Sequence, residues 1–167
     1  MNKMLTTNLN NWTALVARIA LGITIFPHGA QKLLGLFGGN GYAGTMGFLT
    51  TQAGLPYILA LLVILIEFFG SLFLIFGFLT RFAAIGFTGL FLGVISTATL
   101  QNGFFMNWNG TQKGEGIEYF ILLFGLTIIT LILGGGKASV DAAITDSTAT
   151  KTNNKLDLSE LLYSKRH

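Results

Sequence analysis

The chain has 167 residues, of which 51% are hydrophobic and 10% are charged, and its mean hydropathy is +0.65. Soluble domains carry about 25% charged residues, so this composition predicts an integral membrane protein that lies in the lipid bilayer. The absence of cysteine excludes thiol chemistry and leaves too few ligands for a cysteine–histidine zinc site; we expect no metal and no intrinsic cofactor, and the small net charge of +3 argues against a nucleic-acid partner.

The first apolar run follows a polar N-terminal segment, residues 1–11, and predicts a membrane-spanning helix over about residues 12–36. Pro27 interrupts this run. A bilayer crossing takes about 20 helical residues, so the run spans the membrane only if the helix continues beyond the proline. A proline inside a helix removes one hydrogen bond and bends the axis, which predicts a kink at Pro27. The run lacks a small-residue cleavage site, and we therefore do not interpret it as a signal peptide.

Three more apolar runs predict further spans over about residues 56–79, 82–100 and 117–133. Glycine-rich loops would join the spans at residues 38–55, with a short surface helix, and at residues 101–116. Because the connections are short and the number of spans is even, we expect an all-α fold: an integral membrane four-helix up-down bundle over residues 12–137.

The composition changes after the fourth span. From Ala138 onwards Ser, Thr, Asn, Asp and Lys dominate, so residues 138–167 are expected to form a flexible tail that is disordered as far as Lys155. Beyond that point, one amphipathic turn on a membrane surface or on a partner protein is expected from Leu158, Leu161 and Leu162.

Basic residues distinguish the two sides of this bundle. One side carries Lys3, Arg81, Lys137 and the basic residues of the tail. The other side carries Lys113, with Lys32 near its edge. The positive-inside rule then predicts a multi-pass protein of the cell (inner) membrane, with both termini in the cytoplasm and both long loops outside.

Five ionisable residues lie inside the spans or at their edges: Arg18, His28, Lys32, Glu67 and Glu118. A charge in hydrocarbon costs about 2.5–3.5 kcal/mol on insertion scales, so such residues usually have a partner or a function. Arg18 and Lys32 share one helical stripe and are separated by about 21 Å of helical rise. The simplest pairs are therefore Arg18 with Glu67 and Lys32 with Glu118.

These ionisable residues have two interpretations. They could be ion pairs that only fix the register of the helices. They could instead form a polar pocket in the outer half of the membrane, able to bind the head of a quinone-like molecule and to exchange protons. The candidate lining residues are His28, Gln31, Lys32, Glu67 and Glu118. His28 has a suitable intrinsic pKa for proton exchange, but a histidine beside a kink can also be a hydrogen-bonded packing residue.

Several short motifs occur in one order along the chain: Arg18-Ile-Ala-Leu-Gly22, His28-Gly29, Gln31-Lys32-Leu33, Phe37-Gly38-Gly39, Asn102-Gly103-Phe104-Phe105, Gly116-Ile117-Glu118-Tyr119 and a closing motif of Gly134-Gly135-Gly136-Lys137, Ser139 and Asp141. With Glu67 in the second span, this set resembles the DoxX family of small bacterial membrane proteins over about residues 12–141. One feature departs from the family: many relatives have a histidine shortly before the Asn-Gly-Phe-Phe element, where this chain has residues 97–101 without histidine.

The family is similar to the membrane subunits of terminal quinol oxidase and of thiosulfate:quinone oxidoreductase. The resemblance therefore implies an accessory or quinone-interacting subunit of a membrane redox system, with a bound quinone and an oxidoreductase subunit as partners. Arg18 and Lys32 would orient the head group, and His28 and Glu118 would exchange protons. The outer-loop candidates are Asn102, Phe104, Phe105 and Trp108. The three aromatic residues would cover the outer mouth of the pocket, because aromatic residues favour the membrane interface. No catalytic residue is assigned.

Two other functions remain open at this point. The chain could be a non-catalytic membrane scaffold that recruits a soluble partner through its tail, residues 142–167. It could also be a small-molecule carrier, although four spans are few for one and the two halves show no clear inverted repeat. A homo-oligomer would supply more spans.

Overall fold

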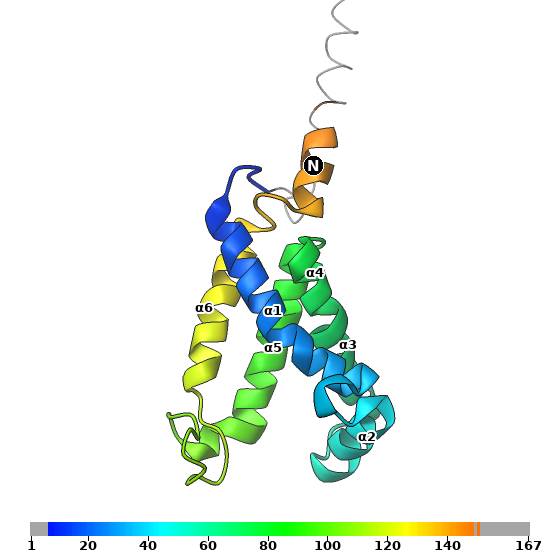
Figure 1. Ribbon diagram of the computed structural model, residues 1–167, viewed down its shortest axis with the longest axis vertical. Helices are drawn as coiled ribbons and strands as arrows, with labels where there is room; N and C mark the ends of the chain where they lie inside the picture. The colour runs from blue at the N-terminus through cyan, green and yellow to red at the C-terminus, as the bar shows by residue number, and fades with distance from the viewer. Residues whose placement is uncertain (1–6, 149, 151–167) are drawn as a thin grey trace, which may run out of the picture.

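The computed structural model describes residues 7–148 and residue 150, and within them every regular element is helical. This confirms the expected all-α class for the described part of the chain. Figure 1 shows α1 (Trp12–Leu34) crossing the molecule obliquely, from the side of α6 to the side of α2 and α3. Asn11 caps the start of α1 by accepting a hydrogen bond from the Ala14 N–H at 3.0 Å. Gly35 ends it in the left-handed conformation, at φ 73°.

The helix α1 continues through Pro27 without a break. The segment is therefore a single run of 23 residues, long enough to cross a bilayer. The bend expected at Pro27 stays a prediction.

Two further helical runs are long and apolar enough to cross a membrane. Tyr57–Phe76 combines α3 (Tyr57–Leu65), the π-helical turn η3 (Ile66–Gly70) and α4 (Ser71–Phe76). The second run, Thr80–Asn102, combines α5 (Thr80–Val94), the π-helical turn η4 (Ile95–Thr99) and the 3₁₀ turn η5 (Leu100–Asn102).

The last apolar helix, α6 (Glu118–Leu133), has 16 residues and is shorter than these three runs. A fourth crossing through α6 therefore stays a prediction. The loop after α1 contains η1 (Leu36–Gly38), α2 (Gly41–Gly47) and η2 (Phe48–Gln52), where a short surface helix was expected.

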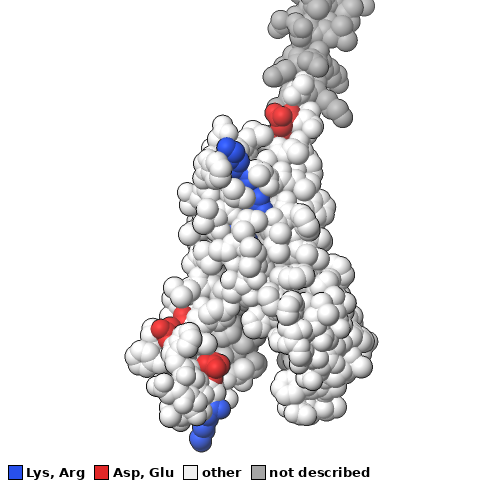
Figure 2. All heavy atoms as spheres, viewed as in Figure 1, with Lys and Arg blue, Asp and Glu red and all other residues white. Residues whose placement is uncertain are grey.

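The helices pack around α1, which contacts α4, α6, η3 and α2, while α5 packs against α6 and η3. The main core cluster consists of Leu21, Ile25, Leu74, Ala83, Phe87, Phe91 and Leu123. A smaller cluster, Met46, Ala60 and Ile64, lies under α2. Away from the termini the molecule divides into two lobes with a hollow between them (Figure 2), one lobe formed by α6, the end of α5 and their loop, the other by α2 and α3. On this face the charged side chains gather near the two ends and the middle is uncharged, as a membrane-embedded surface requires.

The segment that follows α6 differs from the expected flexible tail. Residues 140–148 are helical, and Ser139 caps them by accepting a hydrogen bond from the Ala142 N–H at 3.0 Å. The Asp141 carboxylate in turn accepts hydrogen bonds from the N–H groups of Leu79 and Thr80, both at 2.9 Å, and thereby caps the start of α5. This segment is ordered because it supplies partners for a helix terminus. Leu158, Leu161 and Leu162 lie outside the described residues.

Candidate membrane-embedded polar site

The centre of the candidate site is an ion pair between Lys32 and Glu67. The Nζ atom of Lys32, in the last turn of α1, lies 2.5 Å from Oε2 of Glu67, in the π-helical turn η3. The Glu67 side chain is only 8% exposed and that of Lys32 is 28% exposed. The two expected pairings were wrong, because Glu67 pairs with Lys32 and neither Arg18 with Glu67 nor Lys32 with Glu118 forms an ion pair in the described part of the chain.

Gly29 explains how the two helices come close enough for this pair. A Cβ atom at Gly29 would lie 2.6 Å from the backbone carbon and oxygen of Glu67. Only a residue without a side chain lets α1 approach η3 so closely, as is typical of packed membrane helices. Lys32 follows one turn later on the same face of α1, and its ammonium therefore reaches the carboxylate. Single π-helical turns within α-helices are often found at functional sites, and Glu67 lies in such a turn, η3.

A pocket of about 300 Å³ adjoins the exposed side of Lys32. It lies between the end of α1 and the segment that contains η1 and α2, and its lining residues are Gln31, Lys32, Gly38, Gly39, Asn40, Thr45, Phe48 and Leu49. Gln31 helps to close the α1 end of this pocket, because its side-chain amide donates to the Phe37 carbonyl at 3.1 Å. Of the expected pocket residues, Gln31 and Lys32 line this pocket, whereas Glu67 is reached only through its ion pair with Lys32.

Tyr119 is a residue that the sequence analysis did not select. It is partly buried against the main core cluster, and its hydroxyl is close enough to Glu67 for an electrostatic interaction. Its place in the motif after Glu118 and its polar group in an apolar helix were the features that could have identified it. Glu67 thus pairs with a cation from α1 and interacts electrostatically with a phenol from α6.

Arg18 belongs to a different part of the molecule. Its side chain is 1% exposed, and its five N–H donors make five hydrogen bonds to backbone carbonyls, at 2.6–3.1 Å. Two acceptors, Leu74 and Ile75, are in the last turn of α4, and the other three are Gly135, Lys137 and Ala138 in the loop after α6. Arg18 therefore caps a helix C-terminus and ties it to the loop, and no donor remains to orient a head group.

Glu118 is also engaged locally. It lies in the first turn of α6 and accepts a hydrogen bond from the Met106 N–H at 3.1 Å, which holds the loop before α6 against the helix. His28 is exposed and has no hydrogen bond or ion pair with any residue that the structure describes. Neither residue joins Lys32 and Glu67, so the expected pocket is smaller than the sequence suggested.

The outer-loop candidates lie in the other lobe. Asn102 donates to the carbonyls of Ala98 and Glu115, both at 3.0 Å, and closes the base of the loop. Phe104, Phe105 and Trp108 are 49%, 66% and 82% exposed. Such exposed aromatic side chains suit the membrane interface, but the structure does not place them over the Lys32–Glu67 pair.

The chemistry open to this site is proton exchange and hydrogen bonding to a small polar group. A buried carboxyl paired with an ammonium can hold or release a proton when a third group enters. Among residues 7–148 and 150, no group of three or more His, Cys, Asp or Glu side chains could hold a metal ion.

Comparison with known proteins decides the family. The sequence model of the DoxX family matches residues 13–100, which is more than half of the chain. The chain belongs to the DoxX family. This confirms the resemblance, and together with the three apolar helical runs it establishes a DoxX-family membrane protein.

Two relatives of this DoxX-family protein cover most of its length. The "Inner membrane protein YqjF" of Escherichia coli (strain K12) is 36% identical over 132 residues, which are 76% of this chain and 88% of the relative. The "Putative oxidoreductase CatD" of Bacillus subtilis (strain 168) is 30% identical over 123 residues, which are 74% of this chain and 79% of the relative. No solved structure matches the DoxX-family chain.

Proposed function

We propose that this chain is an accessory, quinone-interacting subunit of a membrane redox system. The observation that carries the proposal is the Lys32–Glu67 ion pair, because Glu67 is 6% exposed in an apolar helix and Lys32 opens onto a pocket. Charged groups inside membrane helices usually mark a substrate or proton pathway. The name of the Bacillus subtilis relative, an oxidoreductase, supports the same class of function.

The residues present fit a quinone head group. A quinone carries two carbonyl oxygens, which need hydrogen-bond donors, on an otherwise apolar ring. The pocket offers the ammonium of Lys32 and the amide of Gln31 beside the apolar side chains of Phe48 and Leu49. The other polar side chains of the lining are Asn40 and Thr45, which add hydrogen-bonding groups beside the two apolar side chains.

The roles of the side chains follow from their chemistry. A bound quinone would supply two-electron, two-proton redox chemistry, with the electrons coming from an oxidoreductase partner. Lys32 would donate a hydrogen bond to a ring oxygen, and Glu67 would keep Lys32 charged and take up or release a proton. Gln31 would orient the head group.

The proposed topology places the site in the outer half of the membrane. It has four crossings, with α6 as the short fourth span, and both termini in the cytoplasm of a bacterial cell whose inner membrane holds the protein. The positive-inside rule supports this orientation, because Arg81 lies against Gly134 and the Lys137 N–H donates to the Asn11 carbonyl, so both basic residues lie at the end where α1 begins. The name of the Escherichia coli relative supports the inner membrane.

Quinone binding tests the proposal directly. The purified chain in mild detergent would be titrated with a short-chain ubiquinone analogue and, separately, with a menaquinone analogue, with binding measured by isothermal titration calorimetry. We expect Lys32→Met to weaken binding about tenfold or more, the typical loss for one charge-assisted hydrogen bond. Glu67→Gln should weaken it less, since the amide still accepts from Lys32.

Lys137→Met is the matched control, because Lys137 lies over the Trp12 ring at the other end of the molecule, 4.2 Å from its centroid. Equal binding by the wild type and both site variants would contradict the proposal. A truncation after residue 150 separates it from the scaffold alternative, because a scaffold would lose its partner while quinone affinity stayed unchanged.

A further inference from the structure

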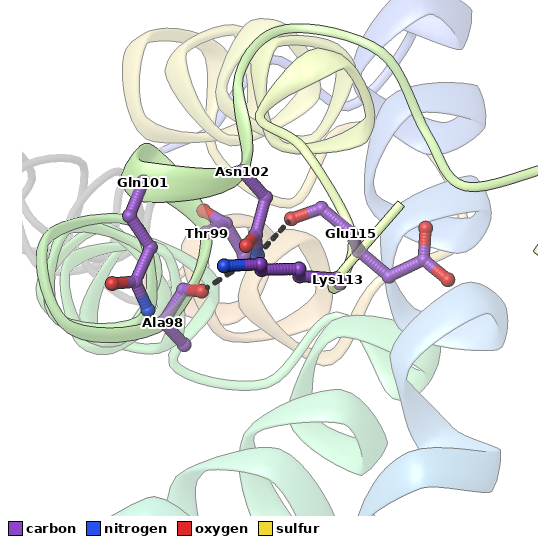
Figure 3. A pocket seen from close by; sticks show the side chains of 7 residues that line it. Ala98, Thr99, Gln101, Asn102, Lys113 and Glu115 are labelled. Carbon is purple, nitrogen blue, oxygen red and sulfur yellow. Dashed lines mark hydrogen bonds between the residues drawn. The ribbon is translucent and has the colours of Figure 1, made fainter. Parts of the chain in front are cut away.

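A second pocket, of about 550 Å³, lies in the other lobe and has no part in the proposed quinone site. It is formed by the end of the second long run, η4 and η5, and by residues 113–115 of the loop before α6. Its lining residues are Ala98, Thr99, Gln101, Asn102, Lys113, Gly114 and Glu115 (Figure 3). Five of these seven residues, all except Ala98 and Gly114, carry polar side chains.

Thr99 is the least ordinary residue of this pocket. It is 6% exposed, and its hydroxyl is the only buried side-chain polar atom without a hydrogen-bond partner among the described residues. Three other helical threonines differ: the hydroxyls of Thr88, Thr97 and Thr127 each donate to the carbonyl four residues earlier, at 2.7–2.9 Å. The carbonyl four residues before Thr99 is that of Ile95. It accepts the Leu100 N–H in the π-helical turn, and the Thr99 hydroxyl does not donate to it. A buried hydroxyl without a partner costs free energy, so it points to a group that the pocket receives.

The charges of the pocket indicate the kind of group. Lys113 extends across the pocket towards Thr99 and Ala98 (Figure 3), and it makes no ion pair or hydrogen bond with any residue in the described part of the chain. The Glu115 carboxylate does not neutralise it, because Glu115 accepts the Asn107 N–H at 2.7 Å and points to the far side of the loop in Figure 3. Asn102 is occupied by two backbone carbonyls. The donors left for a ligand are the Lys113 ammonium, the Thr99 hydroxyl and the Gln101 amide.

We propose that this pocket binds a phosphate group, held by Lys113, Thr99 and Gln101. A compact cation with adjacent neutral donors is the usual way to bind a phosphate oxygen. The same loop carries Phe105 and Trp108, which are exposed as aromatic residues at a membrane interface are. The phosphate could therefore belong to the head group of an anionic lipid or to a free phosphate in solution.

The test uses the purified full chain in neutral detergent and two probes. One probe is phosphatidylglycerol, with phosphatidylcholine as the reference lipid, and the other is inorganic phosphate. Binding would be followed by native mass spectrometry for the lipids and by the rise in the thermal midpoint for both probes. We expect Lys113→Gln to weaken the affinity for the probe that binds about tenfold, and Thr99→Val to weaken that affinity several-fold.

Two matched controls identify a specific effect. Thr97 is two residues before Thr99 and does not line the pocket, and Thr97→Val removes a hydroxyl that already donates to the Gly93 carbonyl. Lys137→Gln removes a cation at the other end of the molecule. Neither should change binding. Thr99→Val should also keep or raise the thermal midpoint without ligand, because it removes an unpartnered buried hydroxyl; a clear fall would mean that the hydroxyl has a structural partner and would overturn its assignment.

The outcomes separate the two sources. Phosphatidylglycerol binding that depends on Lys113 and Thr99, without a response to inorganic phosphate, supports a lipid head group. The same dependence with inorganic phosphate alone supports a free anion. Binding of neither probe, or binding that both variants leave unchanged, overturns the proposal. None of these results depends on quinone binding, so the two proposals can fail independently.

Discussion

Lys32 and Glu67 are 35 residues apart in the sequence, and the structure places the Lys32 ammonium 2.5 Å from the Glu67 carboxylate. The pair joins the end of α1 to the middle of the second helical run, because α1 crosses the molecule obliquely (Figure 1). The pair is thus both the candidate reactive centre and a contact between two helices. Mutations can separate these two contributions.

Removing one member of the pair should destabilise the protein more than removing both. Lys32→Met leaves the Glu67 carboxylate in an apolar site without a cation, and we expect a loss of about 2–3 kcal/mol, reduced from the fully buried case because Lys32 is partly exposed. The double variant Lys32→Met/Glu67→Leu should recover most of that loss. Chemical unfolding in mixed micelles measures both values. If the double variant is as unstable as Lys32→Met alone, the uncompensated charge is not the cause.

Gly29 should not tolerate a methyl group. Gly29→Ala places a Cβ atom 2.6 Å from the Glu67 backbone, so α1 and η3 must separate. We expect a loss of about 1–3 kcal/mol, as for other overpacked sites, and weaker quinone binding because Lys32 moves away from Glu67.

Gly89→Ala provides the comparison for Gly29→Ala, because a Cβ atom at Gly89 in α5 meets nothing within 4 Å. That change should be neutral or stabilising by about 0.5–1 kcal/mol, the ordinary gain from alanine in a helix. Unfolding curves for the two variants, measured side by side, decide the matter. Equal effects at the two glycines would argue against the close contact of α1 with η3.

Arg18 should be a structural residue rather than a ligand-binding one. Arg18→Met leaves five backbone carbonyls without their donor, and we expect the free energy of unfolding to fall by more than about 3 kcal/mol. Arg18→Lys should be intermediate, because an ammonium has three donors and no planar fork. Stability would be measured together with quinone affinity in the fraction that folds. A stable Arg18→Lys protein that has lost quinone binding would show that Arg18 takes part in binding.

Asp141 should stabilise the start of α5. Asp141→Ala removes three acceptor contacts, to the N–H of Leu79 and to the N–H and hydroxyl of Thr80, and should cost about 1–2 kcal/mol as for other helix caps. Asp141→Asn should cost less, since its amide oxygen still accepts. Asp146→Ala, a change at an exposed acid on the same helical segment, serves as control and should leave the thermal midpoint unchanged. A larger effect at Asp146 would show that overall charge, not the cap, is responsible.

Composition and short motifs were sufficient for the coarse description of this protein. In lipid, a long apolar run satisfies its backbone hydrogen bonds internally by forming a helix. The all-α class and three of the helical runs could therefore be predicted from the sequence. The motifs around Gly22, Gly29 and Lys32 were sufficient for the family. They also selected Glu67 and Lys32, because charges inside apolar helices are rare.

The partners of the charged residues were decided only by the tertiary structure. Helical spacing gives the face on which Arg18 and Lys32 lie, but not the tilt of α1, and the tilt determines which acid each one meets. Arg18 donates to carbonyls and not to a carboxylate. The reason is that the end of α4 and the loop after α6 both lie next to its guanidinium. In the same way, the polar composition after Ala138 predicted disorder, but residues 140–148 are helical. The Asp141 carboxylate accepts the Thr80 N–H at the start of a distant helix, and this hydrogen bond holds the segment in place. Local composition does not reveal such long-range hydrogen bonds, because they depend on which backbone groups the fold brings together.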